Sequence, residues 1–173
     1  MVVRHAPVAV EGMCYGRTDL DAAVPARHAA RTVVERLPWS PAAISTSPSR
    51  RCARPASHLA EMLGLRVTVD VRLHELDYGE WDGRPWREIE SEDGARLAAW
   101  MADWARARPP GGESAADLER RVRAWLVERT RIPTLAVTHA GVIRALRVIL
   151  EATAWPDAMS AQVPHLEPLV FSA

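Results

Sequence analysis

The chain has 173 residues, of which 48% are apolar and 25% are charged, and its 22 basic and 22 acidic residues give a formal net charge of zero. This length and ordinary composition indicate one globular domain, residues 1–173, around a single core. A general electrostatic attraction to nucleic acid or to an acidic membrane is not expected, so any anion site must be local.

The cysteines and the apolar runs of the sequence give little indication of a metal, a leader peptide or a membrane span. Cys14 and Cys52 show no metal-ligand spacing, which favours free thiols in a reducing compartment. The first residues show no basic-then-apolar leader, and no run approaches the roughly 20 apolar residues of a membrane span. We therefore expect a cytoplasmic protein with a small-molecule substrate and neither a nucleic-acid nor a membrane partner. A homodimer is left open by the sequence.

The first half of the chain alternates between short apolar runs and helical patterns. Met1 to Val3 predicts a strand that ends at Arg4 and His5, and residues 6–24 are turn-rich. Apolar spacing predicts a helix over about 26–37, and residues 42–45 predict a second strand. Ser47-Pro48 then indicates the start of a helix with proline in its first turn, and Gly64 is a good terminator for it.

The second half continues the alternation. Alternating valines predict a third strand over 67–71, a loop follows over 72–84, and a helical stretch over 86–104 is broken near Gly94. Ser114 with Asp117 is typical of a capping box at the start of the next helix. A strand-helix unit covers about 134–152, and residues 169–171 predict an edge strand. This order favours an α/β fold with a mainly parallel central sheet and helices on both faces.

Histidines mark the ends of two predicted strands, at His5 and His139. The carboxyl ends of parallel strands meet at one crevice, where ligands bind. A strand-end imidazole can attack phosphorus and form a phosphohistidine, and Arg4 and Arg51 can neutralise the phosphate oxygens. Each residue also has a simpler interpretation, as an incidental histidine or a solvated arginine, because all of the basic residues here are arginines.

Glu75 is the candidate proton donor. A carboxylic acid near the bridging oxygen would lower the cost of releasing an alkoxide leaving group. A position between Leu73 and Leu76 would desolvate it in part. Asp77, Glu80 and Asp82 are acidic neighbours that the sequence does not separate from it.

Four segments together resemble the histidine phosphatase superfamily, the phosphoglycerate-mutase-like proteins, and they span most of the chain. The segments are Arg4-His5-Ala6, Ser47 to Ala56, Leu73-His74-Glu75 followed by Gly79, Trp81 and Gly83, and Val137 to Arg144. The resemblance implies a phosphohistidine at His5, an acid at Glu75, a phosphate pocket of Arg4, Arg51 and His139, and neither a metal nor another cofactor.

Within that family, residues 14–20 and 110–114 resemble alpha-ribazole phosphatases, and Trp100 and Trp104 strengthen the likeness. This likeness implies removal of a phosphate during cobalamin biosynthesis, with alpha-ribazole 5'-phosphate as the substrate. Two departures stand out. Ala6 and Ala140 replace glycines of the family pattern, and its Glu-Thr-x-x-Asn segment is absent. We therefore expect Tyr15, Gly16 and Arg17 to supply the missing substrate contacts.

Two other functions remain open. A phosphoglycerate-type mutase would pass the phosphoryl group to a second hydroxyl instead of water, although the mutases resemble this chain less. A non-catalytic module that binds phosphate ligands on the same fold is the second alternative. The full set of His5, Arg4, Arg51, Glu75 and His139 argues against it, because a binding module has no need of the acid.

Overall fold

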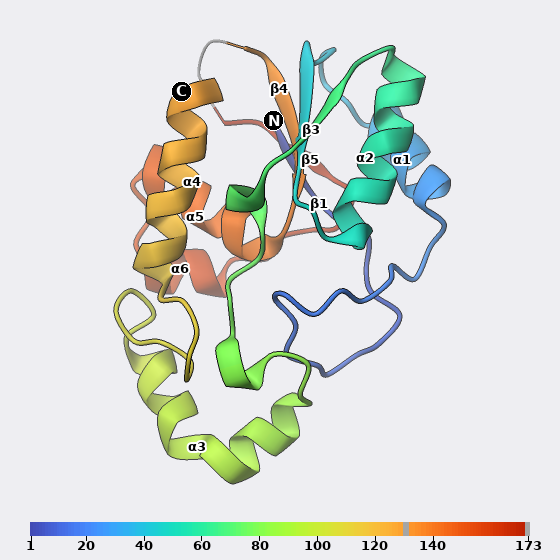
Figure 1. The fold of residues 1–173 in the computed structure, drawn as a ribbon. Helices are drawn as coiled ribbons and strands as arrows, with labels where there is room; N and C mark the ends of the chain where they lie inside the picture. Colours follow the sequence, from blue (N-terminus) through green and yellow to red (C-terminus); the bar gives the residue numbers. More distant parts are fainter. Residues whose placement is uncertain (130–131, 172–173) are drawn as a thin grey trace.

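Within the residues that the structure describes, the central sheet has five strands in the order β3-β2-β4-β1-β5 (Figure 1). The computed structural model describes residues 1–129 and 132–171. The strands are β1 (Val2–Arg4), β2 (Ala43–Thr46), β3 (Val67–Val69), β4 (Thr134–Thr138) and β5 (Pro168–Leu169). The first four run parallel, and β5 pairs antiparallel to β1 at the edge.

The register between β1 and β4 decides where the two strand-end histidines lie. Arg4 pairs with Thr138 in this parallel ladder, and the His5 amide donates to the Thr138 carbonyl oxygen at 3.0 Å. The residues after both strands, His5 and His139, therefore leave the sheet side by side.

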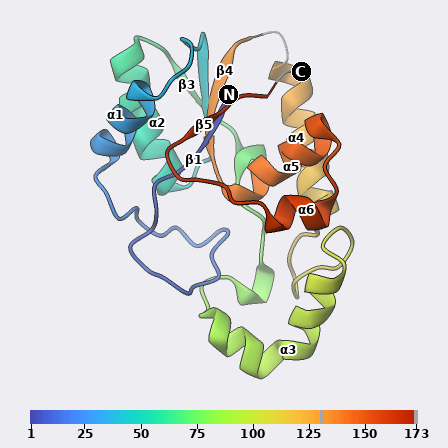
Figure 2. The same ribbon diagram turned by 180° about the vertical axis from the view of Figure 1, so that it is seen from behind.

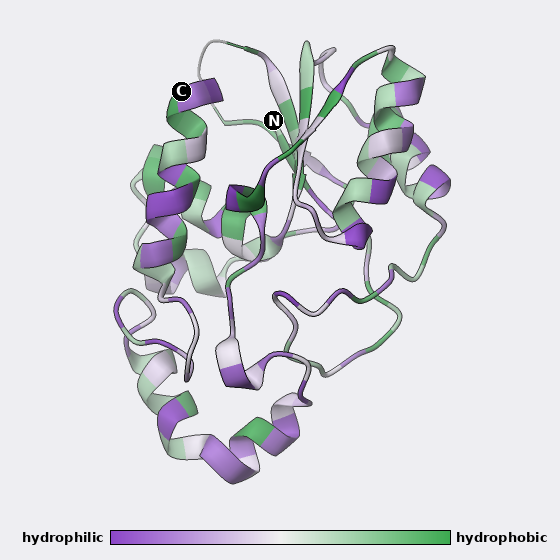
Figure 3. Cartoon of the chain, in the orientation of Figure 1, coloured by the Kyte–Doolittle hydropathy of each residue, from purple (hydrophilic) through white to green (hydrophobic). Residues whose placement is uncertain are grey.

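Helices cover both faces of the sheet (Figures 1 and 2). α1 (Ala26–Glu35) and α2 (Arg50–Leu63) lie on one face, while α4 (Ala115–Arg129), α5 (Ala140–Glu151) and α6 (Trp155–Ser160) lie on the other. The strands alternate their side chains accordingly. Val3 and Val137 pack in the core beneath α1 and α2, whereas Val2 and Ala136 pack beneath α4 and α5. Figure 3 shows α4 with alternating hydrophilic and hydrophobic bands, which is typical of a helix with one buried face.

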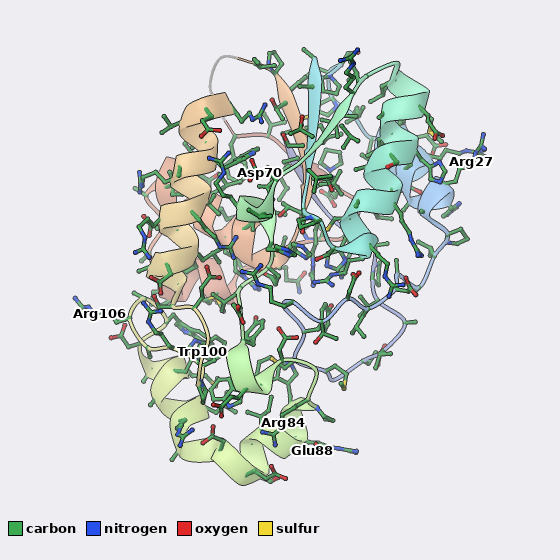
Figure 4. The ribbon with its side chains drawn as sticks, viewed as in Figure 1. Arg27, Asp70, Arg84, Glu88, Trp100 and Arg106 are labelled. Carbon is green, nitrogen blue, oxygen red and sulfur yellow. The ribbon has the colours of Figure 1, made fainter. Side chains whose placement is uncertain are left out.

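Helix α3 (Trp86–Ala102) lies beyond the carboxyl ends of the strands, together with the short 3-10 turn η2 (Gly79–Trp81) (Figure 1). Asp93 has non-helical angles and bends α3 one residue before the predicted break at Gly94. Trp100 projects from α3 toward η2 (Figure 4), and its ring centroid lies 5.7 Å from that of Trp81 and 4.3 Å from that of Trp104. This aromatic contact joins α3 to the rest of the molecule.

The fold class and most elements agree with the sequence predictions. Gly64 ends α2 in a left-handed conformation, and Ser114 and Asp117 form the predicted capping box, with Asp117 Oδ2 accepting from the Ser114 amide at 3.0 Å. Within the described ranges, no helix is both long and apolar enough to cross a bilayer.

Several boundaries were predicted wrongly. α2 begins at Arg50 with Ser49 as its N-cap, so Pro48 precedes the helix instead of occupying its first turn. The third strand ends at Val69, because the Asp70 side chain accepts from the Arg72 amide and starts the 3-10 turn η1 (Val71–Leu73). Helix α6 was not predicted, and the edge strand is Pro168–Leu169 instead of 169–171.

Candidate active site

His5 directly follows β1 and is only 2% exposed. Its Nδ1 lies 2.6 Å from the Ala6 carbonyl oxygen, which can only accept, so Nδ1 carries the hydrogen and Nε2 is the unprotonated atom. Burial, together with the charges of Arg51 and Arg4, lowers the pKa of His5 to about 3 against the opposing effect of the hydrogen bond to Ala6. The ring is therefore neutral at ordinary pH, with a lone pair available for attack on an electrophile.

His139 lies edge-on to His5, with the ring centroids 5.1 Å apart. Arg51 Nη2 donates to its Nδ1 at 3.3 Å, so its Nε2 carries the hydrogen and donates to Ser47 Oγ at 2.8 Å. Complete burial lowers the pKa of His139 well below its ordinary value, and the neighbouring His5 and Arg51 act in the same direction. The two histidines that the sequence placed at strand ends are in contact.

The two candidate phosphate-binding arginines each have a buried donor that is not satisfied. The Arg51 side chain is fully buried, and Arg4 donates from Nη1 to the Val163 carbonyl oxygen at 2.9 Å. The Nε atoms of both residues are buried and have no hydrogen-bond partner in the described part of the chain. A buried guanidinium with free donors is costly unless an acceptor approaches it, and an oxyanion is the strongest acceptor available.

Glu75 lies at the N-terminal end of the helix that His139 caps. Its Oε1 accepts from the Leu76 amide at 2.9 Å and from the Gly141 amide at 3.0 Å, and the residue is 8% exposed. A Cβ atom on Gly141 would lie 2.2 Å from Glu75 Oε1, so this contact requires glycine. The Glu75 carboxylate is thus held against the first turn of α5.

The acidic neighbours of Glu75 have other contacts. Asp77 accepts from the Gly79 amide at 2.9 Å, and Glu80 is exposed. Asp82 accepts from the backbone of residues 16–18, which lie near Arg51. Of the four acids that the sequence could not separate, Glu75 is the one placed beside the start of α5.

Two of the three candidate substrate-binding residues contact Arg51, and the third lies at the surface. The Tyr15 ring centroid lies 5.2 Å from Arg51 Cζ, and the Gly16 carbonyl oxygen accepts from Arg51 Nη2 at 2.9 Å. Arg17 is 39% exposed, with its Nε 3.5 Å from Asp77 Oδ2. Tyr15 and Gly16 therefore contact the cluster, whereas Arg17 lies at the surface. Their roles toward a substrate stay predictions.

Ala6 and Ala140, the two departures from the family pattern, fit without strain. Both are buried, at 0% and 6% exposure, and neither has a positive φ. Their methyl groups are therefore accommodated within the core, and no left-handed backbone at these positions calls for glycine.

His165 and Ser47 also contact the two histidines, although no sequence pattern assigns either of them a role. His165 precedes β5, its Nδ1 donates to the His5 carbonyl oxygen at 2.5 Å, and its ring centroid lies 5.6 Å from that of His5. Ser47 accepts from His139 as described above. Ser47 belongs to the second motif and could have been considered there. His165 belongs to no motif, and its contact joins residues 160 positions apart in the chain.

Two of the cavities in the described part of the chain lie at opposite ends of the strands. One of 360 Å³ is lined by Ala6 and Arg51 together with residues of the α1 start, so it adjoins the histidine cluster. The other, of 330 Å³, is lined by Met1, Val2 and Thr134 and lies at the opposite ends of the strands. Of these two cavities, the first is the one lined by a candidate phosphate-binding residue, Arg51, and its volume suits a small ligand.

Fold and cluster together define an α/β protein with buried histidines and arginines gathered at the carboxyl ends of its parallel strands. The chain belongs to the histidine phosphatase superfamily, branch 1, whose family model matches residues 1–166. It is therefore an enzyme of the histidine phosphatase type.

Individual relatives carry several phosphatase names. A protein of Hydrogenobacter thermophilus named as a phosphoserine phosphatase is 33% identical over 159 residues, which are 86% of this chain and 76% of that protein. Glucosyl-3-phosphoglycerate phosphatase of Mycobacterium tuberculosis is 37% identical over 125 residues, which are 64% of this chain and 54% of that protein.

Solved structures agree on the fold. The mycobacterial glucosyl-3-phosphoglycerate phosphatase superposes with a TM-score of 0.79 at 29% identity, covering 91% of this chain and 81% of that one. The alpha-ribazole phosphatase from Shigella flexneri superposes with a TM-score of 0.82 at 24% identity, covering 95% and 85%. At that identity, the second match supports the fold alone.

Proposed function

We propose that this chain is a phosphomonoesterase in which Nε2 of His5 attacks the phosphorus of a small phosphomonoester. The observation that carries the proposal is the neutral, buried His5 ring, whose Nδ1 hydrogen is held by Ala6. It lies beside His139 and next in sequence to Arg4. A nucleophile of this kind needs a lone pair at neutral pH and cationic donors for the three phosphoryl oxygens.

The reaction runs in two displacements. Nε2 of His5 forms a bond to phosphorus as the ester P–O bond breaks, and Glu75 in its acid form gives a proton to the departing alkoxide. Water then attacks the phosphohistidine, the N–P bond breaks, and the Glu75 carboxylate takes the proton from water, which releases inorganic phosphate. Arg4 and Arg51 bind the phosphoryl oxygens in both steps. His139 lies beside His5, and its Nε2 hydrogen exchanges its present acceptor, Ser47 Oγ, for a phosphoryl oxygen when substrate binds.

Replacement of His5 by alanine tests this proposal. His5→Ala should abolish hydrolysis of a generic aryl phosphate and incorporation of an acid-labile phosphoryl group into the protein, while the circular dichroism spectrum is retained. His28→Ala, on the exposed surface of α1, is the matched control and should keep full activity. Unchanged turnover in His5→Ala would overturn the proposal.

For the substrate, we propose alpha-ribazole 5'-phosphate or a similar small phosphomonoester. The segments that resemble alpha-ribazole phosphatases support this proposal, and a protein of Escherichia coli named adenosylcobalamin/alpha-ribazole phosphatase is 29% identical over 99 residues. Trp100, however, is only 5% exposed and packs against other rings, so it offers no free face for stacking of a base. The names of the other relatives favour glucosyl-3-phosphoglycerate and phosphoserine as competitors.

A panel of phosphomonoesters separates these substrates. kcat/KM should be measured for alpha-ribazole 5'-phosphate, glucosyl-3-phosphoglycerate and phosphoserine with the same enzyme preparation. We expect alpha-ribazole 5'-phosphate to be the best by at least about tenfold, which corresponds to 1.4 kcal/mol in the transition state. A higher value for either competitor would contradict the substrate assignment. Phosphoglycerate supplied in the same assay should yield free phosphate, and formation of an isomer would favour a mutase.

A further inference from the structure

Asp82 holds a distant turn of the chain through its carboxylate. Its Oδ2 accepts from the amides of Gly16 at 3.1 Å and Arg17 at 2.7 Å, and its Oδ1 accepts from the Thr18 amide at 2.9 Å. The Thr18 hydroxyl also donates to Oδ1. Both carboxylate oxygens are thus occupied by one segment, which lies 64 to 66 residues earlier in the sequence.

The same turn, residues 16–18, holds the guanidinium of Arg51. Arg51 Nη1 donates to the Thr18 carbonyl oxygen and Nη2 to the Gly16 carbonyl oxygen, each at 2.9 Å. Its nearest carboxylate contact within ion-pair range is Asp19 Oδ1, at 4.0 Å from Nη1. The orientation of this fully buried cation therefore depends mainly on backbone oxygens, whose position is that of the turn.

Gly16 shows how closely the turn is fitted. A Cβ atom there would lie 1.9 Å from the Leu76 carbonyl oxygen and 3.1 Å from Asp82 Oδ2. The turn is thus pressed against the segment that carries Glu75, and Asp82 fixes it from the other side. A shift of the turn would move both acceptors of the Arg51 guanidinium together.

We propose that Asp82 is a positioning residue for Arg51: its carboxylate fixes the 16–18 turn, and the carbonyl oxygens of that turn orient the guanidinium toward the phosphoryl group. This inference rests on the proposed function, because it takes Arg51 to bind the phosphoryl oxygens. A misplacement of about 1 Å in such a group can cost about 10²-fold in rate.

Asp82→Asn tests the positioning role with an isosteric side chain. One carboxylate oxygen becomes an NH₂ group that cannot accept from a backbone N–H, so at least one of the four hydrogen bonds is lost, since the Thr18 hydroxyl can turn to accept from the NH₂ group. We expect kcat/KM for an aryl phosphate to fall by roughly tenfold to 10²-fold and the inhibition constant of vanadate to rise in parallel. Glu80→Gln makes the same change of charge at an exposed position two residues away, and it should leave both values within about twofold.

The role of Asp82 is separated from general support of the fold by a double-mutant cycle. In an Arg51→Ala background, Asp82→Asn should lower kcat/KM by less than about twofold, because the group that it positions is already absent. The same loss in both backgrounds would overturn the proposal. If Asp82→Asn does not fold, Thr18→Val removes one donor only. Thr18→Val should lower kcat/KM by about two- to fivefold in the wild-type background and leave it unchanged in the Arg51→Ala background. An equal loss of kcat/KM in both backgrounds would overturn the proposal.

Failure of the proposed function is distinguishable from failure of this inference. If the wild-type protein hydrolyses no phosphomonoester, the function is wrong, and calorimetric binding of vanadate then tests the positioning by itself. Weaker vanadate binding in Asp82→Asn, and not in Glu80→Gln, would support the role of Asp82. Equal binding in the wild type and in Asp82→Asn would overturn it.

Discussion

Arg121, on α4, donates a hydrogen bond of 2.9 Å to the backbone carbonyl oxygen of Glu75. The same guanidinium donates to the carbonyl oxygens of Arg72 at 2.6 Å and His74 at 2.8 Å. It also pairs with Glu113, with Nε 2.8 Å from Oε1. One side chain therefore fixes the backbone of the segment that carries the candidate acid, and α4 is coupled to the site through it.

Arg121→Lys should lower both stability and turnover. A lysine ammonium cannot reproduce the planar fork, so several carbonyl oxygens and the Glu113 carboxylate lose donors. We expect the free energy of unfolding to fall by about 2–3 kcal/mol and kcat to fall more than KM changes, because Glu75 is displaced. Urea denaturation and steady-state kinetics measure the two effects. Arg123→Lys, whose side chain is 55% exposed, is the control, and equal behaviour of the two variants would contradict the prediction.

Gly16→Ala should be severely damaging. The added Cβ would meet the Leu76 carbonyl oxygen at 1.9 Å, so the backbone must move, and with it an acceptor of Arg51. We expect a loss of stability of about 2 kcal/mol or more and a large loss of kcat/KM. Gly94→Ala is the matched control, since a Cβ there meets nothing within 4 Å, and it should be neutral or stabilising by up to about 1 kcal/mol. Thermal melting of Gly16→Ala and Gly94→Ala measures the difference in stability. Similar melting temperatures for the two variants would contradict the prediction.

Ser114→Ala should destabilise the protein with little effect on catalysis. Ser114 Oγ accepts from the Asp117 amide at 3.2 Å and donates to Asp117 Oδ2 at 2.6 Å, which satisfies the first turn of α4. Loss of an N-cap of this kind costs about 1–2 kcal/mol, measured here by urea denaturation. Ser91→Ala, at an exposed position on α3, should cost little. A loss of kcat/KM that exceeds about threefold in Ser114→Ala would show that the cap also supports the site.

Stability should fall as the pH drops below about 6.5, the ordinary histidine value. Burial lowers the pKa of His5 to about 3 and that of His74 to about 4, and it also lowers those of His139 and His165. Below pH 6.5 the unfolded chain therefore binds protons that the native state does not bind. The stability that these neutral histidines contribute is fully present above pH 6.5 and is lost as the pH falls toward 3 to 4.

For His5 alone, the expected slope is about 1.4 kcal/mol per pH unit between its unfolded and native pKa values. Urea denaturation at pH 7, 6, 5 and 4 measures it. His5→Asn should give a shallower dependence by about one proton, while His28→Asn should follow the wild type. A free energy of unfolding that is constant from pH 7 to 4.5 would refute the assignment of buried neutral histidines.

Local sequence signals predicted most of the fold because they act over a few residues. The αL conformation of Gly64 and the capping box of Ser114 and Asp117 each occupy one turn of chain, and both lie where the pattern indicated. Boundaries were less accurate where a tertiary or side-chain contact decided them. Asp70 ends the third strand through its bond to the Arg72 amide, which valine alternation could not indicate.

Chain order alone determined that this is an α/β protein with two histidines at the ends of strands, since apolar periodicity and helix caps are written in consecutive residues. Only the tertiary structure decided that β1 lies beside β4. This pairing places the ring centroids of His5 and His139 5.1 Å apart. Only the tertiary structure, likewise, placed Glu75 against the Gly141 amide and gave Asp82 and His165 their contacts. The physical reason is distance along the chain: packing sets contacts across 64 to 160 residues, and no local pattern encodes them.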